Sequence, residues 1–150
     1  MITIGCLAVI AGIFFIDLWI KNKIEAIAPR LPRELCGGHI RLRCYRNEGA
    51  FLNLGRKHPK LVASLSLLLC IALSAVFLAS LCQKGNRLLR SGLALLLGGA
   101  FNNTYDRLKR RYVVDYISFH VKQKRLRNVI FNLSDFAIII GALLLVLGAA

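Results

Sequence analysis

The chain has 150 residues, is 57% hydrophobic, and carries 21 lysine and arginine residues against seven acidic ones, a formal net charge of +14. The length suits one domain. The basic residues flank long apolar runs, so a membrane protein explains the charge better than a nucleic-acid-binding protein does. The sequence contains no phosphate-binding loop, dinucleotide-binding motif or metalloprotease helix motif, which disfavours those enzyme classes.

Four apolar runs of about 18–22 residues divide the chain, and as helices each can cross the ~30 Å hydrocarbon core of a bilayer. They comprise residues 2–20, 61–82, 88–105 and 129–150. We therefore predict an all-α polytopic membrane protein, with four transmembrane helices in a single integral membrane domain over residues 1–150. The first run contains Asp17 and lacks a basic segment before it, which disfavours a cleaved signal peptide.

The first run ends in Asp17-Leu-Trp-Ile-Lys21, whose two charged residues are four apart and can pair on one helix face. The loop 22–60 is too long for a bare connector, so we expect a small β-containing subdomain within it. Apolar and basic residues alternate over 39–45, which is typical of a strand with one buried face. Asn47-Glu-Gly-Ala-Phe51 follows, and its glycine permits a tight turn.

The second run has no charged residue, which indicates a packing role, and the short segment 83–87 predicts that the second and third helices are antiparallel. The third run ends in Gly98-Gly-Ala-Phe-Asn-Asn-Thr-Tyr-Asp-Arg107, whose glycines allow close helix approach. Asn103 and Asp106, three apart, project toward one side with Arg107 beside them. Buried amides and charges need partners, so this cluster favours a functional site over simple packing.

Two more carboxylates frame the last loop. Asp115 lies in a β-branched and aromatic segment, and we expect Asp135 to lie well inside the last helix. An ionisable residue within a membrane segment is a functional hypothesis by default, because placing it there costs several kcal/mol. An even number of spans puts both termini on one side, so the loops 22–60 and 106–128 share the other side. The polar residues expected at that face are Asp17, Asn47, Asn103, Asp106, Arg107, Asp115, Asn132 and Asp135.

The five cysteines carry little functional information. Three lie in apolar runs and are expected to act as small hydrophobic residues. Cys36 and Cys44 share the first loop and can be bridged or free. Together with His39 they loosely suggest zinc, but no fourth ligand is evident, so we predict no metal and no cofactor.

Five blocks of residues, in this order, resemble the lipoprotein signal peptidase family, also called signal peptidase II. They are Asp17…Lys21, Asn47-x-Gly-Ala-Phe51, Gly98-Gly-Ala-x-x-Asn-x-x-Asp-Arg107, Val113-Val-Asp-Tyr116 and Phe131-Asn-x-x-Asp135. The resemblance covers nearly the whole chain. The chain departs from the family at Asn102 and Arg111, where glycine is usual, and at Ser134, where alanine is usual.

The resemblance implies an aspartic endopeptidase that removes the signal peptide from bacterial prolipoproteins, cleaving before the diacylglyceryl-modified cysteine. Asp115 and Asp135 are then the catalytic pair, and Asp17, Asn47, Asn103, Arg107 and Asn132 are the supporting residues, to which we add Asp106. Two close carboxylates do not both ionise cheaply, so they share a proton and serve as acid and base for the attack of water. The implied partners are the lipid-modified substrate and membrane lipids, around a monomer.

The resemblance places the enzyme in the bacterial cytoplasmic (inner) membrane with its active site on the extracytoplasmic face. The charge distribution disagrees, because residues 21–60 and 106–128, on the active-site face, hold 18 of the 21 basic residues, and such loops usually stay in the cytoplasm. We follow the resemblance and expect these loops to meet anionic lipid headgroups.

Two alternatives from other classes stay open. A small transporter or channel would use the aspartates as an ion relay, but a relay would string its acids through the bilayer depth, whereas these cluster at one face. A non-catalytic lipid-binding or assembly protein could share the scaffold. The presence of both Asp115 and Asp135 counts against it.

Overall fold

The computed structural model describes residues 2–50, 54–82, 86–121, 123 and 129–149. Its long helices are α1 (Ile2–Ala26), α2 (Pro59–Cys82), α3 (Arg87–Lys109) and α5 (Leu133–Ala149). Two short 3-10 helices are present: η1 (Ala28–Arg30) lies between α1 and the first strand, and η2 (Cys36–Gly38) connects the first two strands. The strands are β1 (Arg33–Leu35), β2 (Ile40–Asn47), β3 (Val113–Phe119) and β4 (Ile130–Phe131), and they form one antiparallel sheet in that order. Phe51, which closes the first loop's motif, and residues 83–85 of the turn lie outside the described residues.

The expected four helices are all present. Two of them, α1 and α2, have the length and composition of membrane spans, with mean hydropathies of 2.2 and 2.7, and α5 is a shorter apolar helix. Large apolar side chains point outward along these three helices, for example Ile4, Leu68 and Val146, each more than half exposed. A continuous apolar exterior of this kind suits contact with lipid rather than water.

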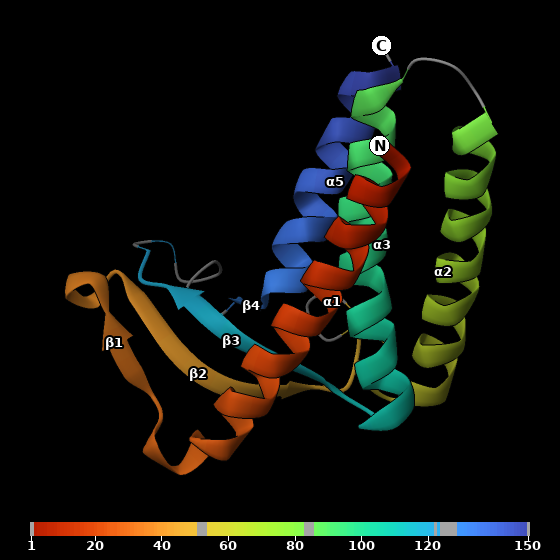
Figure 1. The fold of residues 1–150 in the computed structure, drawn as a ribbon. Coiled ribbons are helices and arrows are strands. Elements are labelled where there is room, and N and C mark those ends of the chain that lie inside the picture. Colours follow the sequence, from red (N-terminus) through yellow and green to blue (C-terminus); the bar gives the residue numbers. More distant parts are fainter. Residues whose placement is uncertain (1, 51–53, 83–85, 122, 124–128, 150) are drawn as a thin grey trace.

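Helix α3 is the centre of the bundle and packs against α1, α2 and α5 (Figure 1). Its glycines explain how closely the helices approach, because a Cβ on Gly98 would lie 3.0 Å from the Cβ of Ile13 on α1. A Cβ on Gly99 would collide with the Ser134 carbonyl of α5, and Gly141 of α5 is equally tight against α3. The prediction of close helix contact at Gly98 and Gly99 is confirmed.

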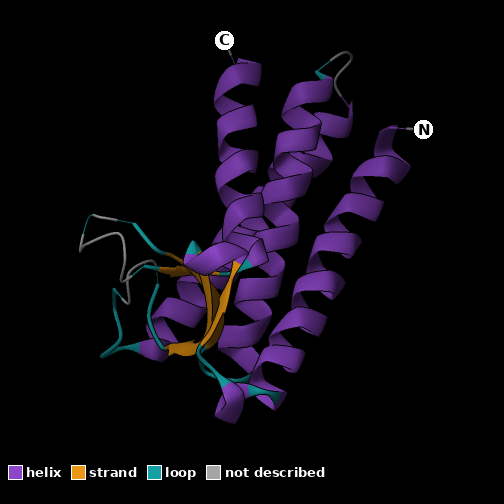
Figure 2. Ribbon diagram, turned by 90° about the vertical axis from the view of Figure 1, so that its left-hand side faces the viewer, coloured by secondary structure: helices purple, strands orange, loops and turns teal. Residues whose placement is uncertain are grey.

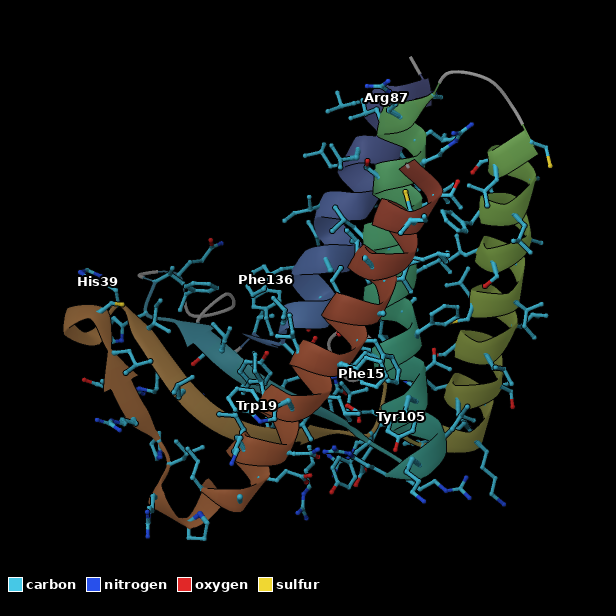
Figure 3. All side chains as sticks on the ribbon, viewed as in Figure 1. Phe15, Trp19, His39, Arg87, Tyr105 and Phe136 are labelled. Carbon is cyan, nitrogen blue, oxygen red and sulfur yellow. The ribbon has the colours of Figure 1, made fainter. Side chains whose placement is uncertain are left out.

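The sheet lies at one end of the bundle, and both chain termini lie at the other (Figures 1 and 2). Figure 3, in the same view as Figure 1, places Arg87 at the end of the bundle where Figure 1 marks the termini, and Phe136 close to the sheet. The prediction that the termini share one side and the two long loops share the other therefore holds for the described residues.

The strand expected over 39–45 is confirmed as part of β2, but the sheet is not confined to the 22–60 loop. Strand β3, from the second long loop, pairs with β2 and places Tyr45 opposite Asp115. The register shifts between Leu42 and Tyr45, as at a β-bulge. One face of the sheet packs on the end of α1, where Ile24 is buried together with side chains of β3.

Three boundaries differ from expectation by four residues or more. Helix α1 continues past residue 20 to Ala26, and α3 continues past residue 105 to Lys109. The last helix begins at Leu133 rather than at residue 129. Ile130 and Phe131 pair with β3 instead, and their apolar character suits either structure. The expectation that Asp135 lies well inside its helix is therefore wrong, because it occupies the first turn.

The cysteines of the first loop do not form a bridge. Cys36 and Cys44 are free thiols, the first exposed and the second half-buried, so the open choice between a bridged and a free pair resolves to the free state. Among the described residues, no three His, Cys, Asp or Glu side chains are grouped closely enough to hold a metal ion.

Candidate active site

Asp115 of β3 and Asp135 of α5 line the same cavity of about 660 Å³, enclosed by the sheet, α2, α3 and α5. Asp115 is only 4% exposed. Its two carboxylate oxygens accept hydrogen bonds from Asn47 Nδ2 at 3.0 Å and Asn132 Nδ2 at 2.8 Å. The residue predicted on the strand is thus held by one amide from β2 and one from the start of α5.

Asp135 is held in a similar way. It accepts a hydrogen bond from Asn103 Nδ2 at 3.0 Å and another from the backbone N–H of Asn132 at 2.9 Å. Asn132 Oδ1 in turn accepts the backbone N–H of Asp135 at 2.9 Å. This reciprocal pair is a capping box that starts α5. Asn132 therefore contacts both carboxylates at once.

A turn at the end of β2 fixes Asn47. Its Oδ1 accepts the backbone N–H of Gly49 at 3.1 Å, and its Nδ2 lies 3.3 Å from the carbonyl oxygen of Ala50. Asparagine side chains stabilise such turns by bonding to the backbone two residues on. The amide orientation is then determined, and Nδ2 is left to face Asp115.

The environment of Asp115 favours its protonated form. Burial, followed by the negative charge of Asp135, raises the pKa of Asp115 to about 7, although the hydrogen bonds from Asn47 and Asn132 oppose the rise. A carboxyl group with this pKa keeps a proton close to neutral pH. The pair can therefore hold one proton and one negative charge, which is the state needed for combined acid and base catalysis.

Lys21 of α1 lies behind the carboxylates and is completely buried. Its ammonium group pairs with Asp17 at 3.2 Å and with Asp106 at 2.9 Å, which confirms the predicted pairing of Asp17 with Lys21. It also donates to Asn103 Oδ1 at 2.9 Å. Because this bond uses the oxygen of the Asn103 amide, the amide nitrogen is turned toward Asp135.

Asp17 joins three elements of the structure. It accepts hydrogen bonds from the Tyr116 hydroxyl at 2.7 Å, from the Ser134 backbone N–H at 3.2 Å and from the Ser134 hydroxyl. Burial and the charge of Asp17 raise the pKa of Tyr116, so the phenol stays protonated as a donor. Asp17 thus fixes β3 and the first turn of α5 relative to α1, without bonding to either carboxylate of the pair.

Asp106 and Arg107 close the cluster from α3. Asp106 is completely buried between Lys21 and Arg110, 2.9 and 3.1 Å away, although neither carboxylate oxygen accepts a well-directed hydrogen bond among the described residues. Arg107 lines the cavity and donates to the carbonyl oxygens of Asn103 and Gly49, both at 3.3 Å. Its Nε is buried without a hydrogen-bond partner in the described part of the chain, so the contact of Arg107 with the cavity is made by other atoms of the side chain.

All eight residues predicted for the site converge at one end of the bundle, but in two groups. Those that line the cavity are Asn47, Asn103, Arg107, Asp115 and Asp135. Asp17 and Asp106 lie behind them, and Asn132 bridges the carboxylates from a buried position. Four further residues take part in this cluster without a predicted site role: Lys21, Asn102, Tyr116 and Ser134. The sequence marks Lys21 by its spacing from Asp17 and Tyr116 by its place in a matching block, and it marks Asn102 and Ser134 only as departures from the family.

Comparisons with known proteins identify the family and the fold of the chain. Residues 9–150 match the family model described as signal peptidase (SPase) II. A lipoprotein signal peptidase from Caldicellulosiruptor bescii is 31% identical over 140 residues, covering 91% of this chain and 85% of that protein. One from Clostridium tetani is 31% identical over 101 residues, and the matched region spans only 63% of that relative and 67% of this chain. Two solved bacterial membrane enzymes share the fold, and each match covers 97% of this chain. The first has a TM-score of 0.80 at 22% identity and is covered over 87% of its length. The second has a TM-score of 0.76 at 21% identity and is covered over 92% of its length.

Proposed function

The chain belongs to the signal peptidase II family, and we propose that it is a membrane aspartic endopeptidase that removes the signal peptide from bacterial prolipoproteins. The bond cleaved precedes the diacylglyceryl-modified cysteine. One observation carries the catalytic part of this proposal. Asp115 and Asp135 line one cavity and are both bonded to Asn132.

The two carboxylates take different roles because their environments differ. Asp115 is deeply buried on a strand and has a pKa of about 7, so it carries the shared proton. Asp135 lies in the first turn of α5, where the positive end of the helix dipole favours a negative charge. Asp135 therefore acts as the base and Asp115 as the acid.

In the first step Asp135 takes a proton from water, and the water oxygen attacks the scissile carbonyl carbon. Asp115 gives its proton to the carbonyl oxygen, so a neutral gem-diol forms instead of an exposed oxyanion. In the second step the C–N bond breaks, Asp135 protonates the leaving nitrogen, and Asp115 recovers a proton from the gem-diol. Both carboxyl groups return to their starting states.

Arg107 supplies a contact to the substrate backbone. Its side chain lines the cavity, and its two terminal nitrogens donate to the carbonyl oxygens of Asn103 and Gly49, which leaves further N–H groups of the guanidinium for a substrate carbonyl. The opposite wall is apolar and includes Leu69 of α2 and Ile139 of α5, both exposed on the outside of the bundle. A substrate that carries acyl chains can therefore enter sideways from the bilayer.

The catalytic proposal is tested by cleavage of a diacylglyceryl-modified prolipoprotein by the purified protein in detergent. Asp115→Asn and Asp135→Asn should each reduce the rate by at least about a thousandfold, because each removes a proton donor or acceptor. Glu48→Gln is the matched control, since Glu48 is exposed and pairs with Arg56 away from the cavity. Substantial turnover by either aspartate variant would refute the assignment of Asp115 and Asp135 as the catalytic pair.

We also propose that α1, α2, α3 and α5 all cross the membrane, with the cavity on the extracytoplasmic side. In a variant without the five native cysteines, a cysteine at Lys57 should react with a membrane-impermeant thiol reagent in intact cells. A cysteine at Arg87, at the opposite end of the bundle (Figure 3), should be protected until the cells are opened. The reverse pattern, which the charge distribution favours, would refute this orientation.

A further inference from the structure

Strand β2 carries three arginines, and two of them have acidic partners. Arg41 pairs with Glu34 at 2.6 Å, and Arg46 lies 3.5 Å from Glu25. Arg43, half-buried between them, makes no hydrogen bond or ion pair with any described residue. It is also the arginine of this strand that lines the cavity containing the two aspartates.

The position of Arg43 along the sheet relates it to the bond that is cleaved. Tyr45, two residues further along β2, is the register partner of Asp115. A strand rises about 3.3 Å per residue, and the bulge between Leu42 and Tyr45 shortens this step, so Arg43 lies at most roughly 7 Å along the sheet from this point. A substrate in an extended conformation advances by the same distance per residue. For an extended substrate that runs alongside β2, the backbone of Arg43 therefore lies at most about two residues from the reacting bond, and its long side chain can reach the second residue.

The charges in the cavity leave a positive excess. Arg43 and Arg107 are its arginines among the lining residues, and the pair Asp115 and Asp135 carries about one negative charge when it shares a proton. An unpaired guanidinium in a largely apolar cavity is costly unless the ligand neutralises it. Guanidinium groups bind carboxylates through two parallel hydrogen bonds, so an acidic side chain of the substrate fits this position.

We propose that Arg43 is a specificity-determining residue that pairs with an aspartate or glutamate about two residues from the scissile bond, on the mature side. This rests on the proposed peptidase function. The mature side is assigned because a signal peptide is apolar next to its cleavage region and enters the hydrocarbon, where a carboxylate is unfavourable. The mature segment leaves toward water and can carry the charge.

The experiment uses three diacylglyceryl-modified prolipoprotein substrates that differ only in the second residue of the mature part, which is aspartate, asparagine or lysine. Rates are measured as kcat/KM with the full-length protein in vesicles of zwitterionic lipid. The unmodified protein should prefer aspartate over asparagine about fivefold, the size typical of a partly exposed ion pair, and lysine should be poorest. Arg43→Gln should abolish the preference for aspartate over asparagine.

Two further variants make the result independent of folding losses. Arg43→Glu should reverse the order and favour the lysine substrate, which a merely unfolded protein cannot do. Arg41→Gln, the matched arginine with its own partner outside the cavity, should keep the original preference.

Several outcomes overturn the inference. Equal rates for the three substrates, or a preference that persists in Arg43→Gln, assign Arg43 no role in selection. A rate that instead depends on anionic phospholipid in the vesicles, and loses this dependence in Arg43→Gln, assigns the guanidinium to a headgroup phosphate. If none of the substrates is cleaved by the unmodified protein, the proposed peptidase function itself fails.

Discussion

Replacement of Lys21 by methionine tests how the buried charges support the site. Methionine preserves the volume and removes the ammonium group that faces Asp17 at 3.2 Å and Asp106 at 2.9 Å. Breaking a buried ion pair costs about 3–5 kcal/mol, because the remaining charge has no water to replace its partner. Asp106 retains Arg110, and Asp17 retains Tyr116 among its donors, so we expect the lower end, about 3 kcal/mol.

For a chain of this length about 3 kcal/mol corresponds to a fall of roughly 9 °C in Tm. The chain offers its own probe for the measurement, because Cys6 and Cys70 are buried thiols. With Cys36, Cys44 and Cys82 replaced by serine, a thiol-reactive dye reports only the exposure of these two on heating in detergent.

Two comparisons make the test specific. Lys23→Met changes an exposed lysine on the same helix and should leave Tm within about 1 °C, since exposed charges contribute little. Lys21→Met combined with Asp106→Asn removes one of the two carboxylates that lose the ammonium group, and should recover about half of the loss. A fall below about 2 °C for the single variant, or no recovery in the double variant, would refute the reasoning.

Three further predictions concern the carboxylates and the helix contact beside them. The rate of cleavage should fall as pH rises through about 7, because Asp115 then loses the proton that burial makes it retain. Asn47→Ala removes a hydrogen bond that lowers the pKa of Asp115, so this alkaline limb of kcat/KM should move to higher pH; a shift to lower pH would contradict the assignment. Gly99→Ala should lower both Tm and activity because its Cβ meets the Ser134 carbonyl beside Asp135, whereas Gly12→Ala, which meets nothing within 4 Å, should change neither; equal effects of the two would argue against the packing explanation.

Local patterns in the sequence were sufficient for the helices and for the convergence of the site. Four long apolar runs define the bundle, and their even number brings distant loops to one end. The pairing of Asp17 with Lys21 follows from their spacing of four on a helix. These are features that chain connectivity and helix geometry determine without reference to tertiary contacts.

Other features depend on contacts that spacing does not encode. The pairing of β2 with β3 joins two loops separated by α2 and α3, and nothing local specifies that register. Ile130 and Phe131 are apolar residues adjoining an apolar helix, so periodicity does not separate strand from helix there. Likewise, the sequence marks Lys21 as a partner of Asp17 but does not reveal that its ammonium group also orients the Asn103 amide.

The start of α5 shows how the fold and the proposed chemistry depend on the same atoms. Asn132 begins the helix by exchanging hydrogen bonds with Asp135, and its remaining amide nitrogen donates to Asp115. Had the helix begun four residues earlier, as the apolar pattern suggests, Asn132 would have lost its capping position, and Asp135 would have left the favourable end of the helix dipole. The two-residue strand β4 prevents this by pairing with β3. The separation of roles between a proton-bearing Asp115 and an ionised Asp135 therefore depends on where this helix begins.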